Sequence, residues 1–259
     1  MGALIAAVSI FVATGLACQL AERFWPYRRF DKPRTLRRDV LGFLWVYFLY
    51  IVSEKLFAAV SNLSPFAGML QWRIQLREKV PGAVLLAAYI VLADFLQYWM
   101  HRLNHSRCLW HTHAAHHSVE NMYWLAGARE SPIHHLLLYS VALPLTPLSP
   151  AGLGIWALFF LATLNQQLIH SNLSWRFGLL EWLLVTPRYH ILHHAAEADL
   201  HDKNFGFLFT IWDRIFGTYV DPNSVRKDFA LGLTYDIRPL RLYLGLPPGL
   251  LRQKQPNAR

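Results

Sequence analysis

The stretch LWHTHAAHHSVENMYW, residues 109–124, places four histidines within seven residues and lies between two tryptophans. Histidine is costly to bury without a partner, and its common roles are proton transfer and metal binding. All 13 histidines of the chain lie between His101 and His201. Such a concentration indicates a site rather than a bias in composition.

The first two histidine groups have the spacing of metal ligands on helices. His101 and His105 are four residues apart, so on a helix they share one face and can bind one ion. His113, His116 and His117 follow the pattern H-x2-HH. At 100° per residue, His116 lies about 60° to one side of His113 and His117 about 40° to the other. This triplet fans out and can serve two metals.

The same H-x2-HH spacing recurs at His190, His193 and His194. One pair and two fanned triplets offer eight imidazoles, which are too many for one ion and suitable for two. The isolated histidines have an ordinary interpretation as hydrogen-bonded core or interfacial residues. They are His111, His134, His135 and His201.

Two other uses of paired histidines fit the sequence less well. A zinc protease requires H-E-x-x-H, and no histidine here is followed by glutamate. A metal transporter would place its ligands in the middle of the membrane, whereas these groups lie at the ends of apolar segments.

The composition indicates a membrane protein. The chain is 54% hydrophobic and only 16% charged, against about 25% charged in soluble proteins. Residues 3–20, 40–53 and 80–93 are uncharged runs, and with their flanks they approach the roughly 20 residues that span a bilayer. No basic residue precedes the first run, so we expect a retained anchor rather than a cleaved signal peptide.

Two further apolar runs, residues 136–148 and 152–169, are short or interrupted by Pro144 and Pro147. We expect them to form a helical hairpin that enters and leaves the membrane on one side. The predicted fold is all-α and integral to the membrane, with transmembrane helices, a helical hairpin and a cytosolic histidine-rich di-metal cap. We divide it into an anchor region (1–80), a histidine-box catalytic domain (81–222) and a cytosolic C-terminal tail (223–259).

Basic residues between the first two apolar runs predict the topology. Only Glu22, Asp31 and Asp39 oppose them, so this segment is expected in the cytoplasm, with the N-terminus and the loop 62–79 outside. The basic residues are Arg23, Arg28, Arg29, Lys32, Arg34, Arg37 and Arg38. This placement accounts for the net charge of +9 without a nucleic-acid partner. The histidine groups then all lie on the cytoplasmic side of a bacterial inner membrane or the endoplasmic reticulum.

The motifs resemble those of the membrane fatty acid hydroxylase and sterol desaturase superfamily. The resemblance rests on the histidine spacing, on His170 between the triplets, and on five stretches: DFLQYWMHRLNH (94–105), ENMYWLAGAR (120–129), LLEWLLVTPRYHILHH (179–194), DKNFG (202–206) and WDRIFGTY (212–219). The last blocks are most similar to the alkylglycerol monooxygenase branch and its bacterial relatives.

The resemblance implies two iron ions that activate dioxygen, although purified protein can contain zinc. It implies nine ligands: His101, His105, His113, His116, His117, His170, His190, His193 and His194. Some members have a further histidine where this chain has Gln166, so a tenth ligand is in doubt, with His201 as one candidate. The candidates for orienting imidazoles are Asp94, Glu120, Asp199, Asp202 and Asn204, with ordinary surface or capping roles as the alternative. Asp213 and Arg214 are expected to be structural.

The sequence therefore predicts a membrane oxygenase that hydroxylates or desaturates a lipid or sterol-like substrate. It carries no nicotinamide-binding G-x-G-x-x-G motif after a strand, so electrons are expected from a ferredoxin or cytochrome b5 type carrier. The alternative is a non-catalytic, zinc-bound membrane scaffold or lipid-binding protein. Nearby aromatics, including Trp110 and Trp124, suit either an acyl channel or an interfacial belt.

Overall fold

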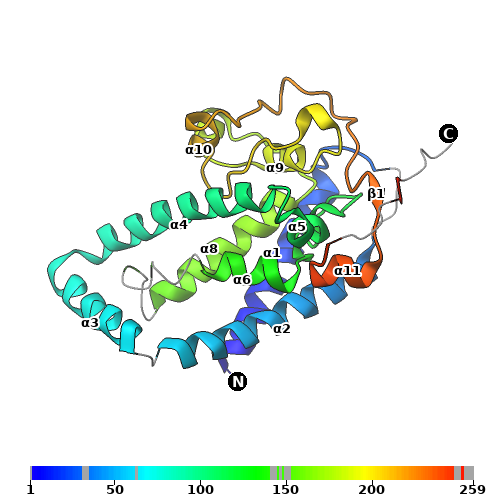
Figure 1. Ribbon diagram of the computed structural model, residues 1–259. Coiled ribbons are helices and arrows are strands. Elements are labelled where there is room, and N and C mark those ends of the chain that lie inside the picture. Colours follow the sequence, from blue (N-terminus) through cyan, green and yellow to red (C-terminus); the bar gives the residue numbers. More distant parts are fainter. Residues whose placement is uncertain are drawn as a thin grey trace.

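The computed structural model describes residues 2–30, 35–61, 64–140, 145, 148, 153–247 and 252–253. The described part is almost entirely helical (Figure 1). The α-helices are α1 (Gly2–Phe24), α2 (Leu36–Ser61), α3 (Ser64–Lys79), α4 (Gly82–Asn104), α5 (Trp110–His117), α6 (Pro132–Ser140), α8 (Leu153–His170), α9 (Pro187–His193), α10 (Ile211–Ile215) and α11 (Pro239–Leu244). The 3-10 helices are η1 (Ala126–Ala128), η3 (Gly178–Trp182) and η4 (Ala198–Leu200). Strands β1 (Tyr235–Asp236) and β2 (Arg252–Gln253) pair antiparallel, Tyr235 opposite Gln253.

Among the described residues, two helical segments are long and apolar enough to cross a membrane. They are Ile5–Phe24 within α1 and Gly82–Asn104, which is α4. Their surfaces carry large exposed apolar side chains, such as Leu16 and Leu20 on α1 and Val84 on α4. The predicted span 40–53 lies within α2, where Leu41, Leu44 and Phe48 are likewise exposed. Contiguous exposed apolar surface of this kind suits contact with lipid.

The predicted loop 62–79 is largely a helix. Helix α3 fills it, beginning at Ser64-Pro65 and continuing through the helix-favouring residues of QLREK. Figure 1 shows α3 connecting α2 to α4 at the end of the molecule opposite α5 and α9. The histidine-bearing helices and this connection therefore lie at opposite ends of the long helices.

The predicted hairpin is described only in its two arms. Helix α6 covers the start of the run 136–148, and α8 covers the run 152–169 from Leu153 onward. The connecting residues 149–151 lie outside the described part of the chain. Helix α8 packs against α1 and α9, and α6 packs against α2, α4 and α5.

One hydrophobic core joins all three predicted segments. Tyr27 comes from the segment 1–80, Met122 and Ile191 from 81–222, and Phe229 and Leu231 from 223–259, and all five are buried in the same cluster. The segment 223–247 thus packs onto the core. The backbones of Ala195 and Leu231 also pair in an isolated antiparallel β-bridge. Residues 222–247 therefore belong to the histidine-bearing end of the molecule, which we call the cap.

Buried charges tie the membrane helices to this cap. The Asp39 carboxylate, on α2, accepts hydrogen bonds from the guanidinium of Arg129 and the hydroxyl of Tyr123. Arg129 also donates to Thr35 and to the backbone and side chain of Ser118. Both charges are buried, with side chains 0% and 2% exposed. The Asp39 carboxylate and the Arg129 guanidinium can both stay buried because each compensates the charge of the other.

Replacing Arg129 with Met should therefore destabilise the fold by about 3–5 kcal/mol, because it leaves the Asp39 carboxylate buried without a counter-ion. Denaturant titration of the detergent-solubilised protein would measure this. The control is Arg226→Met, which breaks an ion pair between Arg226 and Asp228, two side chains that are 88% and 71% exposed. This substitution should change the free energy of unfolding by less than about 0.5 kcal/mol. Equal effects of the two substitutions would contradict the anchoring role.

Candidate di-metal centre

Three helix ends and one short capped helix bring the histidines together. His101 lies in the last turn of α4 and His105 is its C-cap, while α5 carries the first triplet. His170 ends α8. Helix α9 is only seven residues long, and it is started by Pro187 at its first turn and by the Thr186 hydroxyl, which accepts from the Tyr189 N–H.

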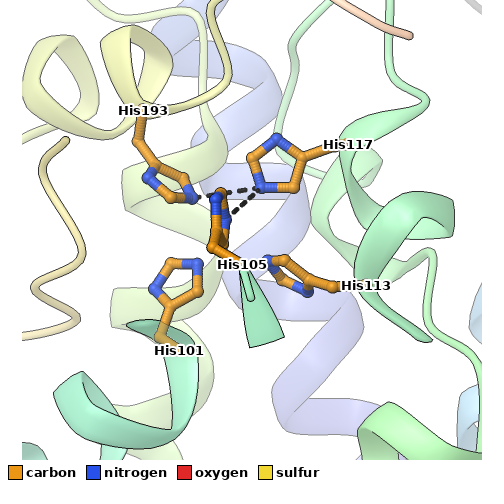
Figure 2. A group of neighbouring side chains, drawn as sticks. All are labelled: His101, His105, His113, His117 and His193. Carbon is orange, nitrogen blue, oxygen red and sulfur yellow. Dashed lines mark hydrogen bonds between the residues drawn. The ribbon is translucent and has the colours of Figure 1, made fainter. Parts of the chain in front are cut away.

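The nine predicted ligands form two groups, each with its candidate ligand atoms within 4.8 Å of one another. The first contains His101, His105, His113, His117 and His193; the second contains His116, His170, His190 and His194. Each triplet is divided between the groups. Figure 2 shows the first group, with its five imidazoles around a common centre and His117 joined to His105 and His193.

Hydrogen-bond acceptors fix the protons of the first group on the outside. Nδ1 of His101 lies 2.8 Å from the Phe205 carbonyl, Nδ1 of His193 lies 2.7 Å from the Lys203 carbonyl, and Nδ1 of His105 lies 3.1 Å from the Asp202 carboxylate. Because these oxygens only accept, we assign the proton of each neutral ring to Nδ1. The Nε2 lone pairs then point inward.

The inward-pointing nitrogens cannot satisfy one another. Nε2 of His105 and Nε2 of His193 each lie 3.1 Å from Nε2 of His117, which carries one proton at most when neutral. Nε2 of His101 and both ring nitrogens of His113 are buried and have no hydrogen-bond partner in the described part of the chain. Buried lone pairs that converge without donors fit a metal ion.

The second group has the same character. His170 donates from Nδ1 to the Gln166 carbonyl of its own helix at 2.7 Å, so its Nε2 lone pair faces Nε2 of His116 at 3.1 Å and of His190 at 2.9 Å. Nε2 of His194 lies 3.2 Å from Nε2 of His190. Gly127 leaves room for this packing, since a Cβ there would lie 2.6 Å from the His170 ring.

The imidazoles are held neutral, as metal ligands must be. Burial, and then repulsion from neighbouring imidazoles, lowers the pKa of these rings well below the ordinary 6.5. The rings so affected are His113, His116, His117, His190, His193 and His194. A neutral imidazole keeps the lone pair that binds a metal at neutral pH. The two groups are consistent with a di-metal site.

A cavity of about 410 Å³ reaches the two groups from between the membrane helices. It is lined by His101 and His113 of the first group and by His116, His170 and His190 of the second. Away from the histidines its wall is mostly apolar, with Phe11, Phe43 and Phe159 from α1, α2 and α8. The cavity can therefore hold an apolar molecule against the histidines of both groups.

Comparison with known proteins agrees with this geometry. The family model described as fatty acid hydroxylase matches residues 86–218, just over half of the chain. The chain belongs to the fatty acid hydroxylase family. It is accordingly an integral membrane protein, and the matched region contains all nine histidines of the two groups.

Similar curated proteins act on lipids by name. The chain is 34% identical to an alkylglycerol monooxygenase of Xenopus tropicalis over 56% of this chain and 32% of that protein. It is 32% identical to an ornithine lipid hydroxylase of Rhizobium tropici (56% and 44%) and 28% identical to a sphingolipid C4-hydroxylase of Schizosaccharomyces pombe (64% and 56%). The chain thus spans between about a third and somewhat over half of these relatives. No solved structure matches it.

In this family member, backbone carbonyls orient two of the first-group rings. Asn204, with a φ of 58°, lies between Lys203 and Phe205, whose carbonyls accept from His193 and His101. The Asn204 side chain holds this turn by bonding to the backbone of Val220 in both directions and by donating to the Tyr189 carbonyl. Asn204 therefore acts through its neighbours rather than on an imidazole.

Asp213, for which the sequence predicts a structural role, fixes the same turn from the other side, but the sequence does not show which turn because Asp213 is far from it in the chain. Its buried carboxylate accepts from the backbone N–H of Phe205 at 2.8 Å and of Gly206 at 2.7 Å. It also accepts from the hydroxyls of Tyr189 and Thr218. A Cβ at residue 206 would lie 2.5 Å from the Phe209 carbonyl, so this turn needs glycine there.

The carboxylates proposed to orient imidazoles differ in what they contact. Asp94 accepts from the N–H groups of Leu208 and Phe209 and from the indole of Trp212, so it ties α4 to the chain just beyond this turn. Glu120 lies beside Gly232, on the wall of a separate polar pocket. Asp202, which is 67% exposed, is the carboxylate that contacts a first-group ring.

Three histidines outside the two groups make ordinary side-chain contacts. His134 is buried, its ring lies tilted against that of His113 with 4.4 Å between the centroids, and it bonds to Asn104, while His135 pairs with Glu130. His201 bonds to the Ala196 carbonyl and lies in neither group. Gln166 lines the cavity and donates weakly to the Gly127 carbonyl at 3.4 Å. Among the predicted aromatics, Trp124 lines the same cavity, whereas Trp110 donates to Tyr235.

Asp213→Asn should lower the metal content from two ions per chain to about one. In the variant, the side-chain NH₂ faces a backbone N–H of the turn, and two donors repel each other. The turn then shifts, and the carbonyls of residues 203 and 205 no longer orient His193 and His101, which both belong to the first group. Plasma mass spectrometry of the purified protein measures the content. Asp221→Asn, at an exposed position, should retain two ions.

His194→Ala provides the complementary case, since it should empty the second group alone. Two ions retained in Asp213→Asn, or loss of both with helical circular dichroism unchanged, would contradict the selective role of the turn.

Proposed function

We propose that this chain is a di-iron lipid hydroxylase that uses O2 and two external electrons. The observation that carries the proposal is the pair of buried, neutral histidine groups facing one largely apolar cavity. The names of the similar proteins, which act on alkylglycerols, ornithine lipids and sphingolipids, support a lipid substrate. Iron is the metal we propose because the reaction needs a redox-active ion, which zinc is not.

The chain supplies the geometry of the reaction. When bound, the iron pair supplies the activation of O2 that allows an unactivated C–H bond to be oxidised. The apolar wall around Phe11, Phe43 and Phe159 excludes water and holds the hydrocarbon part of the substrate. The histidines that line the inner end of the cavity fix which carbon is nearest to the metals.

The outer side of the first group suits the supply of electrons and water. A further pocket of about 220 Å³ is lined by His105, His117 and His193 and by the exposed Asp202. The substrate and the reductant can thus approach from different sides. We propose that a ferredoxin or cytochrome b5 type carrier docks on this side.

We also propose that the histidine cap is cytoplasmic. The end of α1 and the start of α2 lie at the cap, because Pro26 bridges to Leu173 and the Arg28 side chain donates to the carbonyls of Lys227 and Phe229. The basic segment between these helices is thus on the same side as the histidines. By the positive-inside rule that side is the cytoplasm.

Cells that express the chain and grow under 18O2 should accumulate a lipid that has gained one labelled oxygen atom. Mass spectrometry of lipid extracts measures this, and cells that express His194→Ala at the same level should lack the labelled lipid. An unlabelled product that has lost two hydrogens would show desaturation instead. Two bound zinc ions with no iron-dependent O2 consumption would support the non-catalytic scaffold.

A reporter that fluoresces only in the cytoplasm should be active when fused after Arg259 and silent when inserted after Asn62. The reason is the basic segment, whose charge disfavours transfer across the membrane. Membrane fractions must contain both fusions in similar amounts. The reverse pattern of fluorescence would place the histidine cap outside.

A further inference from the structure

A carboxylate–imidazole pair interrupts the apolar wall of the main cavity. The Glu130 carboxylate lies 3.2 Å from Nδ1 of His135, and both side chains are nearly buried, 13% and 12% exposed. Both residues line the cavity that His116 and His170 also line. A carboxylate beside an apolar cavity is costly to desolvate unless donors surround it.

The carboxylate has unused capacity for hydrogen bonds. His135 supplies its one hydrogen bond within the described part of the chain, whereas an ionised carboxylate can accept about four. Burial acts to raise the pKa of Glu130, but the hydrogen bond with His135 opposes this and helps to hold the pKa below its ordinary value. The carboxylate is thus an ionised acceptor in the cavity wall.

We propose that Glu130, positioned by His135, is the subsite that recognises a hydroxyl or amine of the lipid substrate. The inference rests on the proposed lipid hydroxylase function and names its substrate class: lipids whose polar part carries O–H or N–H donors. Lipids whose polar part contains only ether or ester oxygens lack the donor that this carboxylate needs.

The position of the pair also restricts where the substrate reacts. Because Glu130 and the histidines line one cavity, a donor group held by Glu130 lies beside the histidines. The hydrocarbon chain then extends toward Phe11 and Tyr50, on the wall formed by α1 and α2. The oxidised carbon is therefore close to the polar group of the lipid rather than far along its chain.

Two probe lipids test the subsite, one with two free hydroxyls and one in which both hydroxyls are methylated. They are 1-O-hexadecylglycerol and its 2,3-dimethyl ether, each with the same photoreactive diazirine at the end of the chain. Both are titrated into phosphatidylcholine nanodiscs that contain the protein in O2-free buffer, and crosslinked protein is quantified by mass spectrometry. The wild type should reach half-saturation at about tenfold lower mole fraction of the diol, the difference expected for hydrogen bonds to a charged acceptor.

The variant Glu130→Gln should retain two metal ions and reduce this tenfold preference to less than about twofold, because the amide is a weaker acceptor than the carboxylate. Glu181→Gln is the matched control, since Glu181 lies outside the cavity lining and accepts from the Phe177 N–H. It should keep the full preference.

Equal half-saturation of the two probes in the wild type would overturn the subsite, and this comparison stands even if Glu130→Gln fails to fold. An undiminished preference in a metal-loaded Glu130→Gln protein would also overturn it. Failure of the hydroxylase function is a separate result. A preference for the diol without labelled oxygen in cell lipids would leave the subsite intact and reject the oxygenase.

Discussion

Nine imidazoles packed closely into two groups are the constraint on which the rest of the molecule depends. With protons assigned to Nδ1 of His101, His105, His193 and His170, the Nε2 lone pairs are directed at one another. Such an arrangement is unfavourable unless a cation occupies the centre, because buried acceptors without donors lose their hydration with nothing in return. The structure is thus arranged to hold metal ions.

The two groups are held by different means. The first depends on tertiary contacts: a turn at residues 203–206, fixed by Asn204 and Asp213, supplies the carbonyls that orient two of its rings. The second depends more on local structure, since the Gln166 carbonyl that orients His170 comes from the same helix. Loss of long-range order should therefore affect the first group before the second.

Placing the site at the ends of membrane helices reconciles two opposed requirements. The histidines need polar acceptors and access for water-soluble reductants, whereas a lipid needs an apolar path. The apolar cavity contacts both groups, whereas the pocket beside Asp202 contacts other histidines of the first group only. Buried charges such as Asp39 and Arg129 keep the membrane helices and the cap in register, so that the path ends at the histidines.

The sequence by itself determined the elements whose signals are local. Apolar runs marked α1 and α4. The i, i+4 spacing kept His101 and His105 on one face, and the H-x2-HH spacing fanned each triplet between two groups, because helical geometry depends only on residue separation. Tertiary structure alone decided what orients His101 and His193. The carbonyls of residues 203 and 205 carry no side-chain signal, and Asp213 acts on them from a distance in sequence. Likewise, only packing shows that Glu130 faces the cavity, that residues 62–79 contain a helix, and that the chain after Asp221 joins the core. Such contacts join residues far apart in the chain, and periodicity does not encode them.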